Sequence, residues 1–365
     1  MKNKPKKVTV VLPIAGKSSR FSEISSLGYS KYLLPYPMDL STTVMSRLLR
    51  SITGAIISYN NDPNTTFEVV VVTKDIDLIQ DATDSQLRVI QYENEVIKSE
   101  IKSYDDMFGI KYSLYEVGPT VSTMDTLQEW FRLSNPDKPD KLVVVLGDLC
   151  GYDLDDMMKN IVINSSFNTS THVVIPRDDD NDYNVAYDSK LKVIDTWTGS
   201  SPDSSEVQIF DVYDDSNTIA KLSGVSSLCD HYLNCLWDSL SSDTKPLFSH
   251  VDDIYVNDIY YTKSNKKSEV VVYNELTDLD TSTTYLEFLD EYLLARYSFQ
   301  LPPRNSGTHL PLKWYTGDLP DRDGLPKCYL GPLGKSTSKK ILLDLLNGKL
   351  IKLEEDSEGE YREIC

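Results

Sequence analysis

The residues best suited to chemistry lie near the start of the chain, where a buried strand runs into a turn of small residues. The apolar run VTVVL at 8–12 leads to Pro13 and Gly16, and Arg20 and Lys31 follow. Backbone N–H groups in such a turn can face an anion, and the two cations can then neutralise its charge. We interpret this segment as a phosphate-binding site.

Two aspartates further along the chain are candidates for holding a metal ion beside phosphates. Asp148 ends the buried run LVVVLGD, and Mg²⁺ prefers hard carboxylate oxygens next to substrate phosphates. The alternative role for Asp148, a helix N-cap, is better filled by Asp153. Asp278, in NELTDLDT, could supply a second carboxylate, although an acidic helix N-terminus stabilised by the helix dipole explains it equally well. We predict Mg²⁺ as the cofactor.

The segment VGPTVSTMDTL, at 117–127, predicts a turn followed by a helix that Ser122 caps, because serine is a preferred N-cap residue.

The segment PIAGKSSRF, followed after the arginine by KYLLP, resembles the signature loop of the sugar-phosphate nucleotidyltransferases (nucleotide-sugar pyrophosphorylases). That signature commonly reads GxGxRF and then PKxLLP, and the likeness is strongest to the capsule-biosynthesis branch. Here Ser18 stands at the second glycine and Ser30 at the proline before lysine. The resemblance implies a nucleotide-binding loop made of Pro13, Ala15, Gly16, Lys17 and Ser18.

The two cations of this loop suit different tasks. The planar fork of Arg20 can grip β- and γ-phosphate oxygens and stabilise departing pyrophosphate, whereas Lys31 is a point charge suited to the α-phosphate or the incoming monoester. The resemblance further implies that Asp148 and Asp278 bind the metal. The segment at 117–127 is similar to the family's GPTxGxxxT element, which implies that Gly118, Thr120 and Thr123 contact the nucleotide, although a helix cap after a turn explains these residues nearly as well. We therefore predict a Mg²⁺-dependent enzyme that condenses an NTP with a phosphosugar, a sugar 1-phosphate, to give a nucleotide-sugar and pyrophosphate.

The acceptor side matches this family less well. The family has an EK pair on a strand where this chain reads VIDTWTG, without a lysine beside Asp195 or Thr196, and its NAGxY element becomes LSGVS at 222–226. The acceptor could thus be an unusual phosphosugar, another phosphate monoester such as phosphocholine, or absent. Two alternatives stay open. One is a nucleotide-sugar-dependent glycosyltransferase of similar fold, although such enzymes usually carry a DxD pair and the segment GDLCG at 147–151 has none. The other is a catalytically inactive nucleotide-binding regulatory homologue.

The amino-acid composition limits the kinds of partner that this protein can bind. The net charge is −19, from 56 acidic against 37 basic residues, which argues against nucleic acid and anionic membranes because both are bound through Lys and Arg. The 5 cysteines form no CxxC pair, which favours a reducing cytoplasm. No apolar run approaches the roughly 20 residues that a membrane-spanning helix needs. The sequence is also compatible with a homo-oligomer.

Hydrophobic periodicity predicts an α/β fold. Runs that are apolar on both faces at 8–12, 67–72, 112–117 and 142–147 suit central parallel strands, and helical spacing between them predicts crossover helices. With the resemblance, we expect a Rossmann-like, glycosyltransferase-A-type three-layer sandwich with a mixed, mainly parallel sheet. Shorter strands follow from 170 onward.

We divide the chain into a nucleotidyltransferase domain, 1–298, and a linker with a small C-terminal extension, 299–365. The first comprises an NTP half at about 8–160 and an acceptor and second-metal half at about 161–298. Its later part should hold a strand at 269–273 and helices at about 226–241, 252–262 and 283–298. The Pro- and Gly-rich stretch 301–326 predicts a linker before a last helix at about 337–347.

Overall fold

The computed structural model describes residues 4–16, 31–36, 38–59, 64–79, 84–108, 110–176, 183–198, 218–242, 268–279, 285, 352–355 and 361–364. The chain forms two compact units, Met1–Lys17 with Met45–Leu276, and Ser18–Val44 with Thr277–Cys365. No helix in the described ranges is long and apolar enough to cross a membrane.

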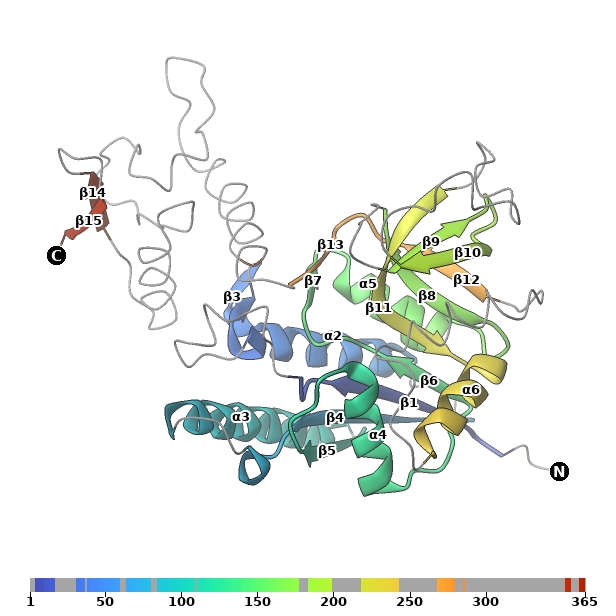
Figure 1. Ribbon diagram of the computed structural model, residues 1–365, viewed down its shortest axis with the longest axis horizontal. Helices are drawn as coiled ribbons and strands as arrows, with labels where there is room; N and C mark the ends of the chain where they lie inside the picture. The colour runs from blue at the N-terminus through green and yellow to red at the C-terminus, as the bar shows by residue number, and fades with distance from the viewer. Residues whose placement is uncertain are drawn as a thin grey trace, which may run out of the picture. The chain divides into compact units, whose positions relative to one another are not determined.

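One half of the large sheet in the first unit is parallel (Figure 1). Its strands lie in the order β6-β1-β4-β5, with bounds β6 (Lys141–Val144), β1 (Lys6–Pro13), β4 (Thr65–Lys74) and β5 (Lys111–Val117). The central residues of β1, β4 and β6 are buried on both faces, which explains their continuous apolar runs, whereas Ser113–Glu116 of β5 are half-buried. The carboxyl ends of all four strands therefore meet at one edge of the sheet.

The other half of the sheet is mostly antiparallel. Its strands are β8 (Ser170–Ile175), β9 (Tyr183–Tyr187), β10 (Val193–Thr198), β11 (Thr218–Leu228) and β12 (Ser268–Val272). Strand β11 joins the two halves, because its residues 226–228 pair with β6 and its residues 218–221 pair with β9. Strand β8 pairs along the opposite edge of β11. Thus β6 and β9 follow one another along the same edge of β11.

Helices cover both faces of the sheet: α2 (Val44–Tyr59) and α3 (Asp84–Phe108) on one, α4 (Thr123–Ser134) and α6 (Asp230–Leu240) on the other. Two residues of β5 that point to opposite faces of the sheet show how the helices are divided between the faces. Tyr112 contacts the hydroxyl of Thr53 in α2 and the ring of Tyr104 in α3, whereas Val117 packs in the hydrophobic core with Trp130 of α4. Because successive strand residues point to opposite faces, the sheet is the middle of three layers.

Shorter elements complete the first unit around the carboxyl edge. They are η3 (Ile76–Leu78), β7 (Leu149–Gly151), α5 (Leu154–Met158) and the π-helical turn η4 (Lys159–Asn164) that continues α5. β13 (Leu276–Asp278) begins at the last residue of this unit.

The second unit contributes short elements to the described part of the chain. They are η2 (Lys31–Leu33), β2 (Pro35–Tyr36), β3 (Asp39–Thr43), β14 (Lys352–Glu355) and β15 (Tyr361–Ile364). β2 pairs antiparallel with β3, and β14 with β15.

The predicted α/β class with a mixed sheet is confirmed, and so are the parallel strands and the strand at 269–273. The helix predicted from 226 is wrong in its start: residues 226–228 belong to β11, because they pair with β6, and α6 begins at Asp230. Several predicted segments lie outside the described residues, namely the helices at 252–262 and 337–347, nearly all of the helix at 283–298, and the linker at 301–326. The division at 298 stays a prediction.

Candidate functional site

The loops that follow β1 and β5 lie side by side at the carboxyl edge of the sheet. Gly16 and Thr120 form a parallel backbone bridge. The chain leading to Gly16 is fixed because Ile14 donates its N–H to the carbonyl of Val72 at 2.8 Å, and Ala15 is buried. Two segments that the sequence predicts to contact a nucleotide are thus brought together, although they lie far apart in the chain.

The side chains at 120–126 are largely engaged in holding their own loop. The hydroxyl of Thr126 donates to the carbonyl of Ser122 at 3.1 Å, so the hydroxyl of buried Thr120 donates to Thr126 at 2.7 Å. Ser122 caps α4, because its Oγ accepts from the N–H of Asp125 at 3.1 Å. Thr123 is the first residue of the helix and is half-buried. This loop can therefore offer a ligand its backbone groups more readily than the Thr120 hydroxyl.

A pocket of about 310 Å³ opens beside this loop. It is lined by Gly118, Pro119, Thr120, Val121, Asp125, Gln128, Glu129 and Arg132. Its lining carries two carboxylates against one guanidinium, and Arg132 is paired with Glu129 at 2.7 Å. Such a lining disfavours phosphate and suits an uncharged group with hydrogen-bond donors.

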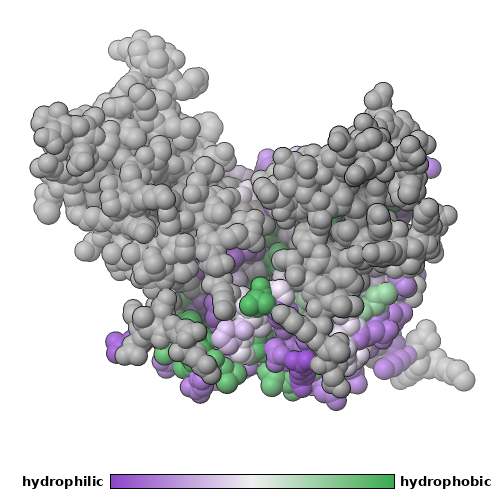
Figure 2. Space-filling view, in the orientation of Figure 1, coloured by the Kyte–Doolittle hydropathy of each residue, from purple (hydrophilic) through white to green (hydrophobic). Residues whose placement is uncertain are grey.

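Exposed apolar side chains accompany the loops of this edge. Figure 2 shows hydrophilic and hydrophobic side chains interspersed on one face of the described surface. Leu78 follows β4 and is 53% exposed, Val121 follows β5 and is 70% exposed, and Tyr152 follows β7 and is 54% exposed. A Cβ on Gly118 would meet Leu78 Cδ1 at 3.6 Å, so the loops after β4 and β5 are in contact. These side chains offer a flat ligand an apolar surface.

Asp148 lies just beyond β6, at the same sheet edge as Gly16. The backbone after β6 remains hydrogen-bonded to β1 as far as Val145, whose N–H donates to the carbonyl of Val11 at 2.9 Å. Asp148 itself is half-buried. Asp153 does occupy the N-cap position of α5, but its side chain makes no capping hydrogen bond, which corrects the expectation that it caps this helix well.

Two glycines that sequence reasoning did not single out as site residues fix the segment around Asp148. A Cβ on Gly151, at φ +155°, would lie 2.0 Å from the carbonyl oxygen of Glu275. A Cβ on Gly224, at φ +73°, would lie 2.2 Å from Cδ1 of Leu146. Only glycine permits the approach of the Glu275 backbone, and at Gly224 the positive φ favours glycine while the Leu146 side chain would have to move to admit a Cβ. These two glycines are only weakly indicated in the sequence. Gly151 follows the buried run that ends at Asp148, and Gly224 stands in the segment LSGVS at 222–226.

Several predicted site residues cannot be placed with these. Lys17, Ser18 and Arg20 lie outside the described residues, as does the side chain of Asp278 at the end of β13. Lys31 opens η2 in the second unit, where its Nζ lies 5.4 Å from the centre of the Tyr32 ring. Their roles stay predictions.

No protein-family model matches the chain, and no curated protein matches it either. Among solved structures, the chain is similar to the CTP:phosphocholine cytidylyltransferase of Streptococcus pneumoniae, with 14% sequence identity and a TM-score of 0.48. The alignment covers 78% of this chain and 99% of that one.

Proposed function

We propose that the protein is a nucleotidyltransferase that condenses an NTP with a phosphosugar and releases pyrophosphate. The observation that carries this proposal is the backbone bridge between Gly16 and Thr120. It joins a loop suited to phosphate with a loop beside a pocket suited to a nucleoside, and Asp148 follows the adjacent strand. Ligands of open α/β sheets bind beyond the carboxyl ends of the strands, which is where these residues lie.

The nucleotide's two ends would bind to different loops. The triphosphate would lie along the turn that starts at Pro13, where backbone N–H groups and the cations Arg20 and Lys31 can meet it. The base and ribose would occupy the pocket beside Gly118, since its acidic lining repels phosphate and its neighbours Leu78 and Val121 are apolar.

The donor set fits Mg²⁺ only together with substrate phosphates. Among the described side chains, no group of three or more His, Cys, Asp or Glu could hold a metal ion unaided. Mg²⁺ is commonly bound by one or two carboxylates plus phosphate oxygens and water. We propose Asp148 and Asp278 as these carboxylates.

The chemistry would be an in-line displacement at the α-phosphorus. A phosphate oxygen of the acceptor forms the new bond to the α-phosphorus, and the bond from the α-phosphorus to the oxygen that joins it to the β-phosphate breaks, so that pyrophosphate leaves with that oxygen. Arg20 would stabilise the charge that develops on pyrophosphate, and Lys31 would hold the α-phosphate. Bound Mg²⁺ would supply additional charge neutralisation at the phosphates.

The test is a matrix of the four NTPs against sugar 1-phosphates and phosphocholine, with Mg²⁺, in which pyrophosphate release is measured. We expect release with at least one pair, and loss of it in Arg20→Ala and Asp148→Ala proteins that remain folded. Equal release from wild type and both variants would exclude the proposed site. Transfer from a nucleotide-sugar without NTP consumption would favour a glycosyltransferase instead, and NTP binding without turnover would favour an inactive homologue.

A further inference from the structure

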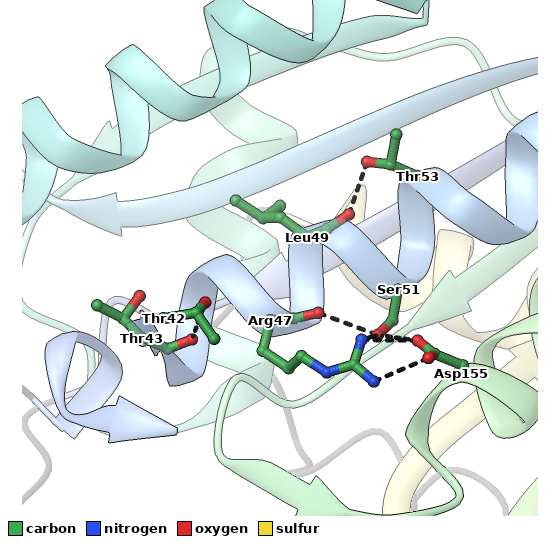
Figure 3. A network of polar contacts seen from close by, with 7 residues as sticks. All are labelled: Thr42, Thr43, Arg47, Leu49, Ser51, Thr53 and Asp155. Carbon is green, nitrogen blue, oxygen red and sulfur yellow. Dashed lines mark hydrogen bonds and ion pairs between the residues drawn. The ribbon is translucent and has the colours of Figure 1, made fainter. Parts of the chain in front are cut away.

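The first turn of α5 carries two adjacent carboxylates that reach different segments. Asp155 accepts two hydrogen bonds from the guanidinium of Arg47 in α2, at 2.7 and 2.8 Å (Figure 3). Ser51 of α2 donates to the same carboxylate at 2.7 Å, and Arg47 also donates to the Ser51 hydroxyl at 2.8 Å. The Arg47 guanidinium, with help from Ser51 and against the effect of burial, holds the pKa of Asp155 below its usual range.

Asp156 makes the second connection. It accepts a hydrogen bond from the hydroxyl of Tyr273 at 3.1 Å, and Asn160 donates to the oxygens of both residues, at 2.6 Å to Tyr273 and 3.1 Å to Asp156. Burial raises the pKa of Tyr273 to about 12, so the phenol keeps the proton that it donates. Tyr273 follows β12 directly and is itself tied to β8 through its N–H.

These contacts join three segments that adjoin the proposed site along the chain. α2 follows the predicted phosphate-binding segment in the chain, α5 follows Asp148 with only β7 and a turn between them, and Tyr273 precedes the backbone that touches Gly151. We propose that Asp155 and Asp156 are positioning residues that brace the Asp148 loop, residues 147–153, between α2 and the segment at 273–276. We call these two sets of contacts the brace. Its effect on catalysis rests on the proposed function, whereas the contacts themselves do not.

The contact between Arg47 and Asp155 restricts orientation in addition to any stability that it adds. The side chain of Asp155 is 64% exposed and that of Arg47 is 18% exposed, and exposed ion pairs contribute to the free energy of unfolding mainly where their geometry is bidentate, as it is here. The forked geometry with a third donor from Ser51 fixes the direction of the carboxylate, as bidentate Arg–carboxylate pairs do. Removing a group that orients a metal-binding side chain without contacting the metal commonly weakens metal affinity by 10- to 100-fold.

The first test uses hydrogen exchange in the free protein, so it needs neither metal nor activity. We expect Asp155→Asn and Tyr273→Phe each to raise amide exchange in residues 147–153 at least several-fold, and Arg47→Lys, which keeps the charge but loses the fork, to do so partly. The matched control is Glu269→Gln, which removes a surface ion pair with Lys192 elsewhere. Unchanged exchange in 147–153 for the first two variants would overturn the brace.

The second test measures the affinity for Mn²⁺ by electron paramagnetic resonance with an NTP present, together with kcat and KM. We expect Asp155→Asn and Tyr273→Phe to weaken Mn²⁺ binding about tenfold. We also expect kcat to fall while the KM for NTP changes little, and excess Mg²⁺ to restore part of the rate. Faster exchange without any change in metal affinity would reject the positioning role. If Asp148→Asn also left Mn²⁺ binding intact, the proposed metal site itself would be wrong, and the exchange data would still decide the brace.

Discussion

The two edges of the parallel half of the sheet differ in how deeply their charged groups are buried. At the amino edge, charged groups are closed off by partners within the protein: Glu68 is paired with Lys7 at 2.9 Å and with Lys111. Lys141 is fully buried, and its Nζ donates to the carbonyl and the hydroxyl of Ser165, both at 3.0 Å. At the carboxyl edge, the corresponding positions are loops with glycine, exposed apolar side chains and half-buried Asp148.

This difference shows that a shifted pKa alone does not identify the site. Burial lowers the pKa of Lys141 to about 8, yet its ammonium faces Ser165 and the ring of Phe167, at 4.6 Å from the ring centre, with no room for a ligand. Shifted groups often mark functional sites, but buried structural groups shift as well. The proposal of a site at the carboxyl edge rests instead on the backbone bridge between Gly16 and Thr120 and on the pocket beside Gly118.

The largest effect should come from Asp148. We expect Asp148→Asn to lower kcat for pyrophosphate release on the order of 10³-fold, because it removes a charge that acts on the transferring phosphates. Circular dichroism should show an unchanged fold. Lys141→Met, at the other end of the same strand, should leave kcat within twofold. A comparable loss in both variants would show that the two edges are not functionally distinct.

Gly151→Ala should have the next largest effect. The new Cβ would lie 2.0 Å from the carbonyl oxygen of Glu275, and backbone atoms cannot give way as a flexible side chain can. We expect a loss of at least about 3 kcal/mol in the free energy of unfolding, measured by urea denaturation. Gly54→Ala is the matched control: Gly54 is exposed in α2 with nothing within 4 Å, so alanine should stabilise by about 0.5–1 kcal/mol. The same sign for both substitutions would contradict the close approach.

Lys141 allows the amino edge to be tested by pH. Its pKa is about 8 in the folded protein, below the ordinary value of 10.5, so the folded state disfavours the charged form. This cost is fully present below pH 8 and is relieved as the pH rises from about 8 toward 10.5. We expect Lys141→Met to stabilise the protein by about 1–2 kcal/mol at pH 7, after the lost hydrogen bonds to Ser165 are subtracted, and by less at pH 9. Lys98→Met, at an exposed ion pair with Glu116, should show no such trend. Equal stabilisation by Lys141→Met at both values would refute the shift.

The parallel strands could be predicted because burial on both faces leaves a direct trace in the sequence, as in VTVVL and LVVVLG. Gly16 and Thr120 could be proposed as contacts, but their meeting depends on the strand order, which local patterns do not contain. The start of α6 was misjudged because Ser226–Leu228 pair with β6, and this long-range pairing overrides local helical spacing.

The connections through α5 were not predictable for a similar reason. Asp155 and Asp156 look like ordinary acidic residues in the first turn of a helix, where the dipole favours them. Only the fold shows that their partners, Arg47 and Tyr273, come from segments more than a hundred positions away along the chain. Charge alone gave no indication of these partners, because the chain carries 56 acidic residues.

Ser122 should show the smallest effect, and it separates the two interpretations of the loop before α4. As an N-cap whose Oγ accepts from the N–H of Asp125, it should cost about 1 kcal/mol of unfolding free energy when changed to alanine, and only a few tenths when changed to glycine. If its hydroxyl served only the helix, the KM for NTP would change less than twofold in both variants. We expect that result, because the hydroxyls of Thr120, Ser122 and Thr126 are engaged in holding the loop itself, which leaves the loop's backbone groups for a ligand. A KM raised tenfold by Ser122→Ala in a protein of near-normal stability would instead make Ser122 a nucleotide contact and would extend the site along α4.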